Sequence, residues 1–258
     1  MPADSADDKQ VLSVWTRPER RRREQPSLSR GQIVSEAVRL LDAEGMDALS
    51  MRKLGTRLNA GATSLYTHVA NKDELIELVV DAVYGEMRVP DPAELEASTD
   101  PEGWRTATIA CADTIRSTIL AHPWIVSVLG ETGVAHLGPN MMRLTDGMLG
   151  MLEAGGFTLE EADRAVNTLF SYVIGMTTTE AAWLTSLARS GRSEQEWVEQ
   201  LRPAVEKSVE AYPRLRALYA AQRESQASET REDNFTYGLH RVLDGLALRR
   251  KNAATDRG

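Results

Sequence analysis

The segment 50–72 limits the fold of this chain more than any other part, because it holds two short helical patterns separated by only three residues. Ser50 is a predicted N-cap, and apolar residues then repeat at helical spacing for about two turns. The residues Asn-Ala-Gly at 59–61 predict a tight turn, in which asparagine or glycine can take a left-handed conformation. Another short helix is expected over about 62–69. With a supporting helix before them, these helices outline a helix-turn-helix.

The rest of the chain also shows helical periodicity and no strand alternation. Ser29 is expected to cap the supporting helix, which Gly45 ends, and Asn71 to cap a connecting helix that reaches about Met87. After a Pro-rich connection, helical patterns resume at 102–121, 123–135, 139–154, 159–188, 194–212, 215–223 and 230–250.

We therefore predict an all-α fold. A three-helix helix-turn-helix DNA-binding domain is expected to be joined by the connecting helix to a larger helical domain. The predicted parts are a flexible basic tail at 1–28, the DNA-binding domain with its connecting helix at 29–88, and the larger domain at 89–258, for which the resemblance carried by residues 49–72 and 155–162 implies ligand binding and dimerisation.

Charge is distributed unevenly along the chain. The formal net charge is −8, yet residues 17–72 carry 11 Lys and Arg against 6 Asp and Glu, a net of +5. The remainder after residue 72 carries −11. Such a body repels the DNA backbone everywhere except at the basic stretch, which favours one docking orientation. Four basic residues form the run Arg20–Arg23, which either contacts phosphates or only keeps the tail soluble.

Composition limits where the protein acts. With 258 residues, 42% of them hydrophobic, the chain can bury a sizeable core. The single cysteine cannot form an internal disulfide, and no apolar stretch is long enough for a signal peptide or a membrane span. We therefore expect a cytoplasmic protein with no membrane partner.

The residues LSMRKLGTRLNAGATSLYTHVANK at 49–72 resemble the DNA-binding module of the tetracycline-repressor family of bacterial regulators. The positions that match are Ser50, Arg52, Leu65, Tyr66, His68, Asn71 and Lys72. The resemblance implies a transcriptional regulator, in this family most often a repressor, that binds a palindromic double-stranded DNA operator as a homodimer. DNA geometry also requires a dimer, since two recognition helices must reach major grooves about 34 Å apart.

The recognition helix is expected to enter the major groove with its first turn. This places the small side chains of Ala62, Thr63 and Ser64 nearest the base edges. None of them offers a bidentate base contact, so we expect specificity to depend partly on Arg52 and partly on DNA shape. Phosphates are expected near Tyr66, which can also be half core, and near His68, which can instead be a local cap. The predicted DNA-binding residues are Ser50, Arg52, Ala62, Thr63, Ser64, Tyr66, Thr67, His68 and Lys72.

The block GGFTLEEA at 155–162, followed by Gly175 in the next long helix, resembles the regulatory domain of the tetracycline-repressor subfamily. In those relatives the long helix after the Gly-Phe step and the final helix form a four-helix bundle between two subunits. The resemblance implies the same role here for 159–188 and 230–250, with packing within one subunit as the alternative. The apolar stripe suited to either role is Phe235, Leu239, Val242, Leu243 and Leu246.

The effector site departs from the subfamily pattern. His136 is similar to the metal-ligating histidine, but the positions aligned with the drug-contacting His, Asn, Gln and Glu hold Arg88, Cys111, Met148 and Thr179. We therefore predict no metal, no cofactor, and a pocket for a small apolar or aromatic effector. Its expected lining, with ordinary core as the alternative for each residue, is Trp104, Cys111, Met141, Met148, Met151, Phe170, Met176 and Trp183. The polar members of the expected pocket are His136, Asn167 and Thr179, with Thr178 and Glu180 as further candidate anchors.

Signals of catalysis are missing from the sequence. It contains no HExxH, GxSxG, P-loop or GxGxxG motif, and its four histidines are scattered, so we predict that the protein is not an enzyme. One alternative is a helical ligand-binding protein or enzyme that retains a non-functional helix-turn-helix, against which the confined basic charge and the intact motif count. Another is a constitutive DNA-packaging protein, against which the acidic charge of the residues after 72 counts.

Overall fold

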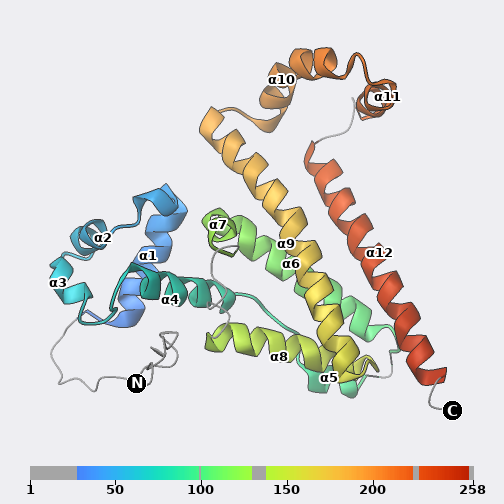
Figure 1. Ribbon diagram of the computed structural model, residues 1–258, viewed down its shortest axis with the longest axis horizontal. Helices are drawn as coiled ribbons and strands as arrows, with labels where there is room; N and C mark the ends of the chain where they lie inside the picture. Colours follow the sequence, from blue (N-terminus) through green and yellow to red (C-terminus); the bar gives the residue numbers. More distant parts are fainter. Residues whose placement is uncertain (1–27, 99, 130–137, 223–226, 256–258) are drawn as a thin grey trace, which may run out of the picture. The chain divides into compact units, whose positions relative to one another are not determined.

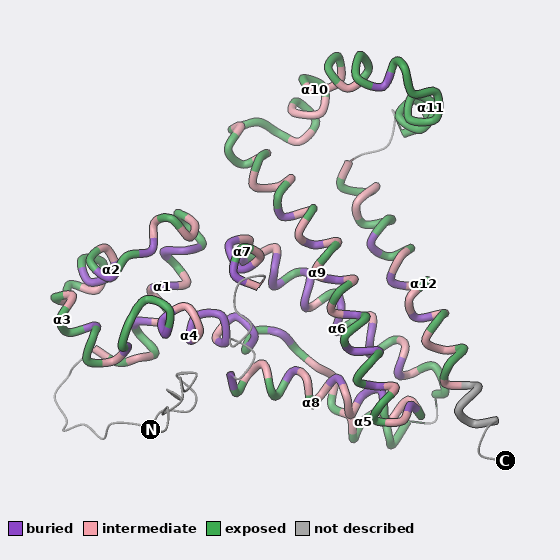
Figure 2. Tube along the Cα trace, in the orientation of Figure 1, coloured by how far each residue is buried: buried purple, intermediate pink, exposed green. Residues whose placement is uncertain are grey.

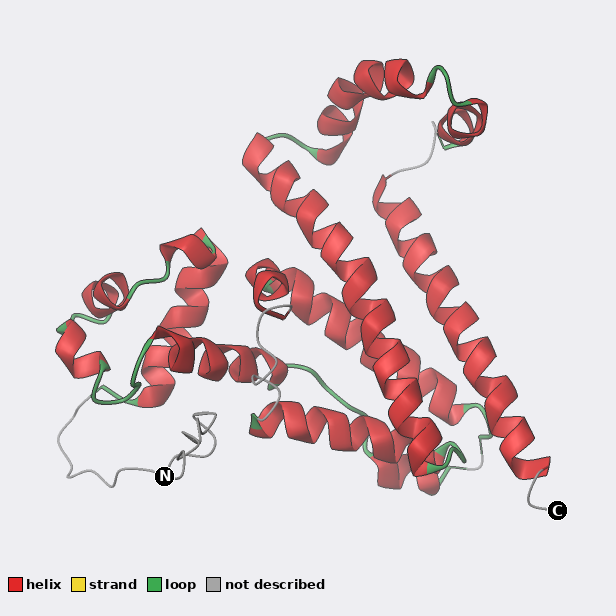
Figure 3. Cartoon of the chain, viewed as in Figure 1, coloured by secondary structure: helices red, strands yellow, loops and turns green. Residues whose placement is uncertain are grey.

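The computed structural model describes residues 28–98, 100–129, 138–222 and 227–255. Arg20–Arg23 and His136 lie outside these residues. Every regular element in the described ranges is helical, which confirms the predicted all-α class (Figure 3). In chain order (Figure 1) the elements are α1 Arg30–Glu44, η2 Met46–Ala48, α2 Met51–Arg57, α3 Ala62–Leu65, α4 Lys72–Tyr84, α5 Pro92–Glu96, α6 Gly103–Ala121, η3 Pro123–Ile125, α7 Val126–Leu129, α8 Pro139–Ala154, α9 Leu159–Ser190, α10 Glu194–Val209, α11 Pro213–Ala221 and α12 Ala227–Thr255.

The predicted caps are confirmed. The Ser29 hydroxyl accepts from the backbone N–H of Gln32 at 3.2 Å, and the Gln32 side chain accepts from the Ser29 N–H at 2.9 Å, which completes a capping box. Ser50 accepts from the Lys53 N–H at 3.2 Å and starts α2. The Asn71 side chain accepts from the N–H of Glu74 at 2.8 Å and starts α4. Each cap satisfies a backbone donor that the first turn leaves without a helical partner.

Several expected boundaries were wrong. Helix α3 ends at Leu65 rather than near residue 69, because the following residues form tighter turns in which the His68 N–H donates to the Leu65 carbonyl at 2.8 Å. The Pro-rich connection contains the short helix α5, which Asp91 caps and Pro92 begins. The final helix starts at Ala227, three residues before the expected start at 230.

Contacts divide the chain into two compact units. The first consists of Met1–Met87 and Trp124–Asp146, and the second of Arg88–Pro123 and Gly147–Gly258. The domain boundaries predicted after residues 28 and 88 stay predictions. In the first unit α1 packs against α2 and α4. Its fully buried side chains include Ile33, Leu40, Leu54, Leu65, Leu75 and Val79.

In the second unit α9 packs against both α6 and α12, and the long helices α9 and α12 lie side by side (Figure 1). Phe235, Leu239 and Leu243 are each at most 2% exposed, so these stripe residues belong to the core of the single chain. Val242 and Leu246 are half-buried. Helix α11 has no buried residue, and Figure 2 shows the exposed surface of this segment.

Candidate functional site

The turn between α2 and α3 is fixed by a close backbone approach. The Ala60 N–H donates to the Gly55 carbonyl at 2.8 Å, and Asn59 takes the left-handed conformation with φ 49°. A Cβ at Gly55 would lie only 2.7 Å from the Ala60 carbonyl oxygen. Asparagine tolerates the left-handed region better than most residues, and glycine alone permits this approach. These residue types therefore hold α3 in a set position on α2.

The predicted recognition surface faces solvent. Thr63, Ser64 and Thr67 are exposed, while Ala62 is half-buried. Leu65 and Val69 are at most 1% exposed, so they hold the segment on the core as expected. The exposed residues therefore form a free polar surface on one side of this core.

The flanking predicted contacts divide between exposed and half-buried positions. Tyr66 is 51% exposed, which excludes it from the core of the single chain. His68 is half-buried. Lys72, the first residue of α4, is exposed next to the Asn71 cap. Tyr66 and Lys72 are therefore accessible for phosphate contact.

The three cations of α2 have different surroundings. The ammonium of Lys53 pairs with Glu44, and the Nε of Arg57 lies 2.6 Å from Glu36 Oε1. Hydrogen bonds from Arg57 and then from Arg39 hold the pKa of Glu36 below its ordinary value. Arg52 is exposed and has no ion-pair partner in the described ranges. It is therefore the cation of this helix that is available to another molecule.

The acidic partners on α1 were missed by sequence reasoning. Glu36 lies 21 positions before Arg57, and such a separation gives no local signal of pairing. Only the packing of α1 against α2 brings the two side chains together. The basic charge of this region therefore overstates the charge that is free to meet DNA.

Four of the predicted effector residues are buried in the second unit. Trp104 and Cys111 of α6 and Met148 and Met151 of α8 are each at most 2% exposed. Burial raises the pKa of the Cys111 thiol to about 12, so this cysteine stays neutral. The Thr108 hydroxyl and the Met151 sulfur, 4.0 Å apart, show that α6 and α8 meet beside them. These side chains could equally be core or the inner wall of a pocket.

The remaining predicted effector residues lie on α9. Phe170, Met176 and Trp183 are half-buried. Asn167 and Thr179 are exposed, and their side chains donate to carbonyls of their own helix at 2.9 and 3.5 Å. Met141 is half-buried and belongs to the first unit. The single chain therefore does not gather the whole predicted set into one buried site.

A network of charges engages two side chains that sequence reasoning had placed near the effector, Glu180 and Trp183. Arg116 donates twice to Glu180, at 2.8 and 3.0 Å, and once to Glu232, at 2.5 Å. Burial opposes the charge of Arg116, but the hydrogen bonds that it donates to both carboxylates outweigh this effect and raise the pKa of Arg116 above the ordinary value. The Trp183 indole donates to Glu194 at 2.7 Å. Glu180 and Trp183 are thus engaged within the chain.

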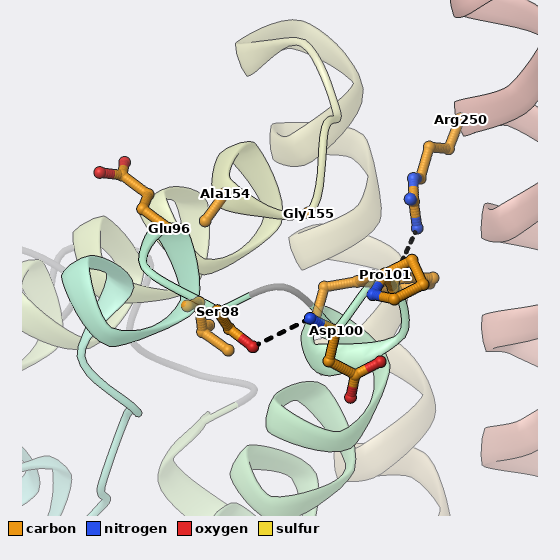
Figure 4. A pocket seen from close by; sticks show the side chains of 9 residues that line it. Glu96, Ser98, Asp100, Pro101, Ala154, Gly155 and Arg250 are labelled. Carbon is orange, nitrogen blue, oxygen red and sulfur yellow. Dashed lines mark hydrogen bonds between the residues drawn. The ribbon is translucent and has the colours of Figure 1, made fainter.

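A small cavity of about 170 Å³ opens in the second unit (Figure 4). Of the predicted effector residues only Trp104 lines it, and its indole Nε1 is buried without a hydrogen-bond partner in the described part of the chain. Arg250 donates to the Pro101 carbonyl at 3.1 Å across the opening. Ligand pockets are usually larger, at about 300 Å³ or more. The cavity is therefore no match for the predicted effector site.

Two family models match the chain. Residues 33–79 match the model described as bacterial regulatory proteins, tetR family, and residues 97–250 match the tetracyclin repressor-like C-terminal domain. The chain belongs to the tetR family. The resemblance drawn from the segment 49–72 is thereby confirmed, and the second match confirms the resemblance of the regulatory domain.

Individual tetR-family relatives extend the match over most of the chain. An HTH-type transcriptional regulator of Saccharopolyspora erythraea is 40% identical over 171 residues, which cover 66% of this chain and 69% of the relative. The HTH-type transcriptional repressor DrrR1 of Streptomyces coeruleorubidus is 31% identical over 225 residues, 86% of this chain and 78% of the relative. The crystal structure of ActR from Streptomyces coelicolor in complex with actinorhodin has a TM-score of 0.68 and 30% identity, covering 86% of this chain and 97% of ActR.

Across the ranges that the structure describes, no three His, Cys, Asp or Glu side chains are grouped so that they could hold a metal ion. No helix in those ranges has the length and apolar character needed to cross a membrane.

Proposed function

We propose that the protein is a repressor that binds a palindromic operator as a homodimer and that a small apolar or aromatic effector releases it. The observation that carries the proposal is the exposed polar surface of the recognition segment beside Arg52, which has no ion-pair partner among the described residues. Neither side chains of the core nor acids of α1 occupy this surface among the residues described. We further propose that the protein has no catalytic role and acts in the cytoplasm, where its DNA lies.

In this proposal the base edges are read by Thr63 and Ser64 together with Arg52. Tyr66, Thr67 and Lys72 contact phosphates, and the caps Ser50 and Asn71 set the helices that carry them. The names of relatives support the regulatory part, since DrrR1 is called a repressor and ActR was crystallised with actinorhodin. The buried apolar wall at Trp104, Cys111 and Met148 supports an apolar effector.

The homodimer is proposed to form through the surfaces of α9 and α12 that the core leaves open. Tyr237 and Leu248 of α12 are 69% and 64% exposed, although the buried stripe on the same helix packs within the chain. Small side chains on the open face of α9, such as Gly175, let a second helix approach closely. Analytical ultracentrifugation of the full chain should show a dimer, and Tyr237→Glu should shift it towards the monomer.

The test of DNA binding uses duplexes selected from a random-sequence pool with the full-length protein. At a stated salt concentration we expect the selected duplex to bind about a thousandfold or more tighter than random DNA of equal length. Arg52→Ala and Thr63→Ala should each weaken the selected duplex by about 5- to 150-fold and random DNA much less.

The matched control is Arg39→Ala, which removes the same charge from an exposed position on α1. It should weaken both duplexes slightly and equally. If no duplex is enriched, or if Arg52→Ala weakens selected and random DNA by the same factor, the proposed reading of bases by Arg52 is wrong.

A further inference from the structure

A buried carboxylate of α4 holds the start of α8 within the first unit. Asp81 is 3% exposed. Its Oδ1 accepts from the backbone N–H groups of Asn140 at 3.0 Å and Met141 at 3.1 Å, and its Oδ2 accepts from the Asn140 side chain at 3.0 Å. The same amide of Asn140 donates to the Asp81 carbonyl at 3.1 Å. Removing one partner of such a bonded buried charge is strongly destabilising, so the two helices are tied together.

Two glycines, Gly138 and Gly85, make this close contact possible. A Cβ at Gly138 would lie 2.1 Å from Asp81 Oδ1, and a Cβ at Gly85 would lie 3.0 Å from the Asn140 amide nitrogen. Arg143, one turn further along α8, donates to the Met87 carbonyl at 3.2 Å. The end of α4 and the first turn of α8 are thus joined by the side chains of Asp81, Asn140 and Arg143.

Helix α8 itself belongs to both units. It is one unbroken helix of 16 residues, in which positions up to Asp146 group with the first unit and positions from Gly147 with the second. In the second unit its later turns bury Met148, Met151 and Leu152. A packed helix moves as a rigid element, so a displacement of its buried end reaches its first turn.

We propose that Asp81 is the positioning residue through which the regulatory unit acts on the DNA-binding unit. Its carboxylate makes α4 follow α8, and α4 packs on α1, which supports the recognition segment. Regulation then passes through α8 and Asp81, in addition to the chain connection between α4 and α6. This inference rests on the proposed function, since it concerns how operator binding and effector binding are linked.

The linkage is reciprocal, so it can be measured from the DNA side with no effector in hand. Hydrogen exchange of the full-length protein is followed with and without the selected duplex. In the wild type, DNA should slow exchange in residues 147–154 by about fivefold or more, the lower end of ordinary coupling between sites. Asp81→Asn should abolish this slowing while the DNA still protects α2 and α3.

Asp146→Asn is the matched control, because it makes the same change at an exposed position on α8. It should behave like the wild type. Asn140→Ala, which removes two of the four hydrogen bonds and keeps the backbone donors, is the second variant if Asp81→Asn does not fold, and it should reduce the slowing.

The inference is overturned if DNA leaves residues 147–154 of the wild type unchanged, or if the slowing persists in full in Asp81→Asn or, where that variant does not fold, in Asn140→Ala. If no duplex is selected at all, the proposed function fails first, and the inference with it.

Discussion

The DNA-binding and regulatory units use charged side chains in opposite ways. On α2 two cations are held by acids of α1, and Arg52 is left open on the surface. In the regulatory unit Arg116 is only 11% exposed, and both of its carboxylate partners lie within the chain. Arg52 therefore marks a contact surface of the first unit, whereas Arg116 is an internal fastening in the second. Charged residues indicate a binding surface only where no other residue of the chain forms an ion pair with them.

The sharpest test of this comparison is Arg116→Met. It leaves Glu180, which is 12% exposed, without its bidentate partner. We expect the free energy of unfolding to fall by about 3–5 kcal/mol, the usual cost of breaking a buried ion pair. Urea denaturation followed by circular dichroism measures the change.

Arg164→Met is its control, since Arg164 is 59% exposed and pairs with Glu160 on the open start of α9. Its effect should stay within about 0.5 kcal/mol. Equal losses in the two variants would show that Arg116 is not an internal fastening.

A second prediction concerns the turn that positions the recognition segment. In Gly55→Ala the added methyl group meets the Ala60 carbonyl oxygen at 2.7 Å, and backbone must move. We expect a loss of about 1–3 kcal/mol in stability, as in other overpacked sites, and weaker operator binding. Gly31→Ala, where nothing lies within 4 Å, should leave DNA binding intact and raise stability slightly. The same loss at both positions would contradict the close-approach argument.

Two equivalent N-caps, Ser50 of α2 and Ser193 of α10, can separate an effect on stability from an effect on DNA binding. Ser50→Ala and Ser193→Ala each remove a hydroxyl that accepts from a backbone N–H three residues later. Each should cost about 1 kcal/mol of stability. Only Ser50→Ala should also weaken the operator complex, because α2 carries Arg52. Thermal unfolding and DNA titration of the two variants check this, and an equal effect on DNA binding would remove the distinction between the units.

The smallest expected effect is on the acid side of the stability curve. The hydrogen bond from Arg231, and a weaker one from Trp183, lower the pKa of Glu194 from its ordinary 4.5. The stability that this carboxylate contributes is therefore complete above pH 4.5 and is lost as the pH falls through the lowered value. Glu194→Gln should flatten this decline by about 1 kcal/mol or less, since the site is partly exposed. If the free energy of unfolding of Glu194→Gln falls between pH 6 and pH 3 as steeply as that of the wild type, this prediction is wrong.

Much of the fold could be predicted from local signals. Ser29, Ser50 and Asn71 indicate helix starts, because each capping hydrogen bond joins residues only three positions apart. The end of α3 could not be found in this way, since Leu65 and Val69 keep helical spacing although the chain between them forms tighter turns. Periodicity reports which side of a segment is buried, and it is a poor guide to where the hydrogen-bond ladder stops.

The candidate site was also predictable only where its signals are local in the sequence. Exposed residues of the recognition segment follow from the family motif and from the apolar spacing of Leu65 and Val69. The engagement of Glu180 by Arg116 could not be inferred, because 64 positions separate the two. The hydrogen bonds between Asp81 and Asn140, which are 59 positions apart, could not be inferred either. Such pairs depend on tertiary packing, which single-sequence patterns do not contain.

The assignment of Trp124–Asp146 to the first unit matters for anyone who builds hybrid regulators. A graft cut after residue 88 would carry the DNA-reading helices to a new sensor without the segment that packs with them. The Trp124 indole, which donates to Asp42 at 2.7 Å, would be left behind with the old sensor. A modular exchange should therefore transfer two separate stretches of sequence, or redesign the surface that the second stretch covers.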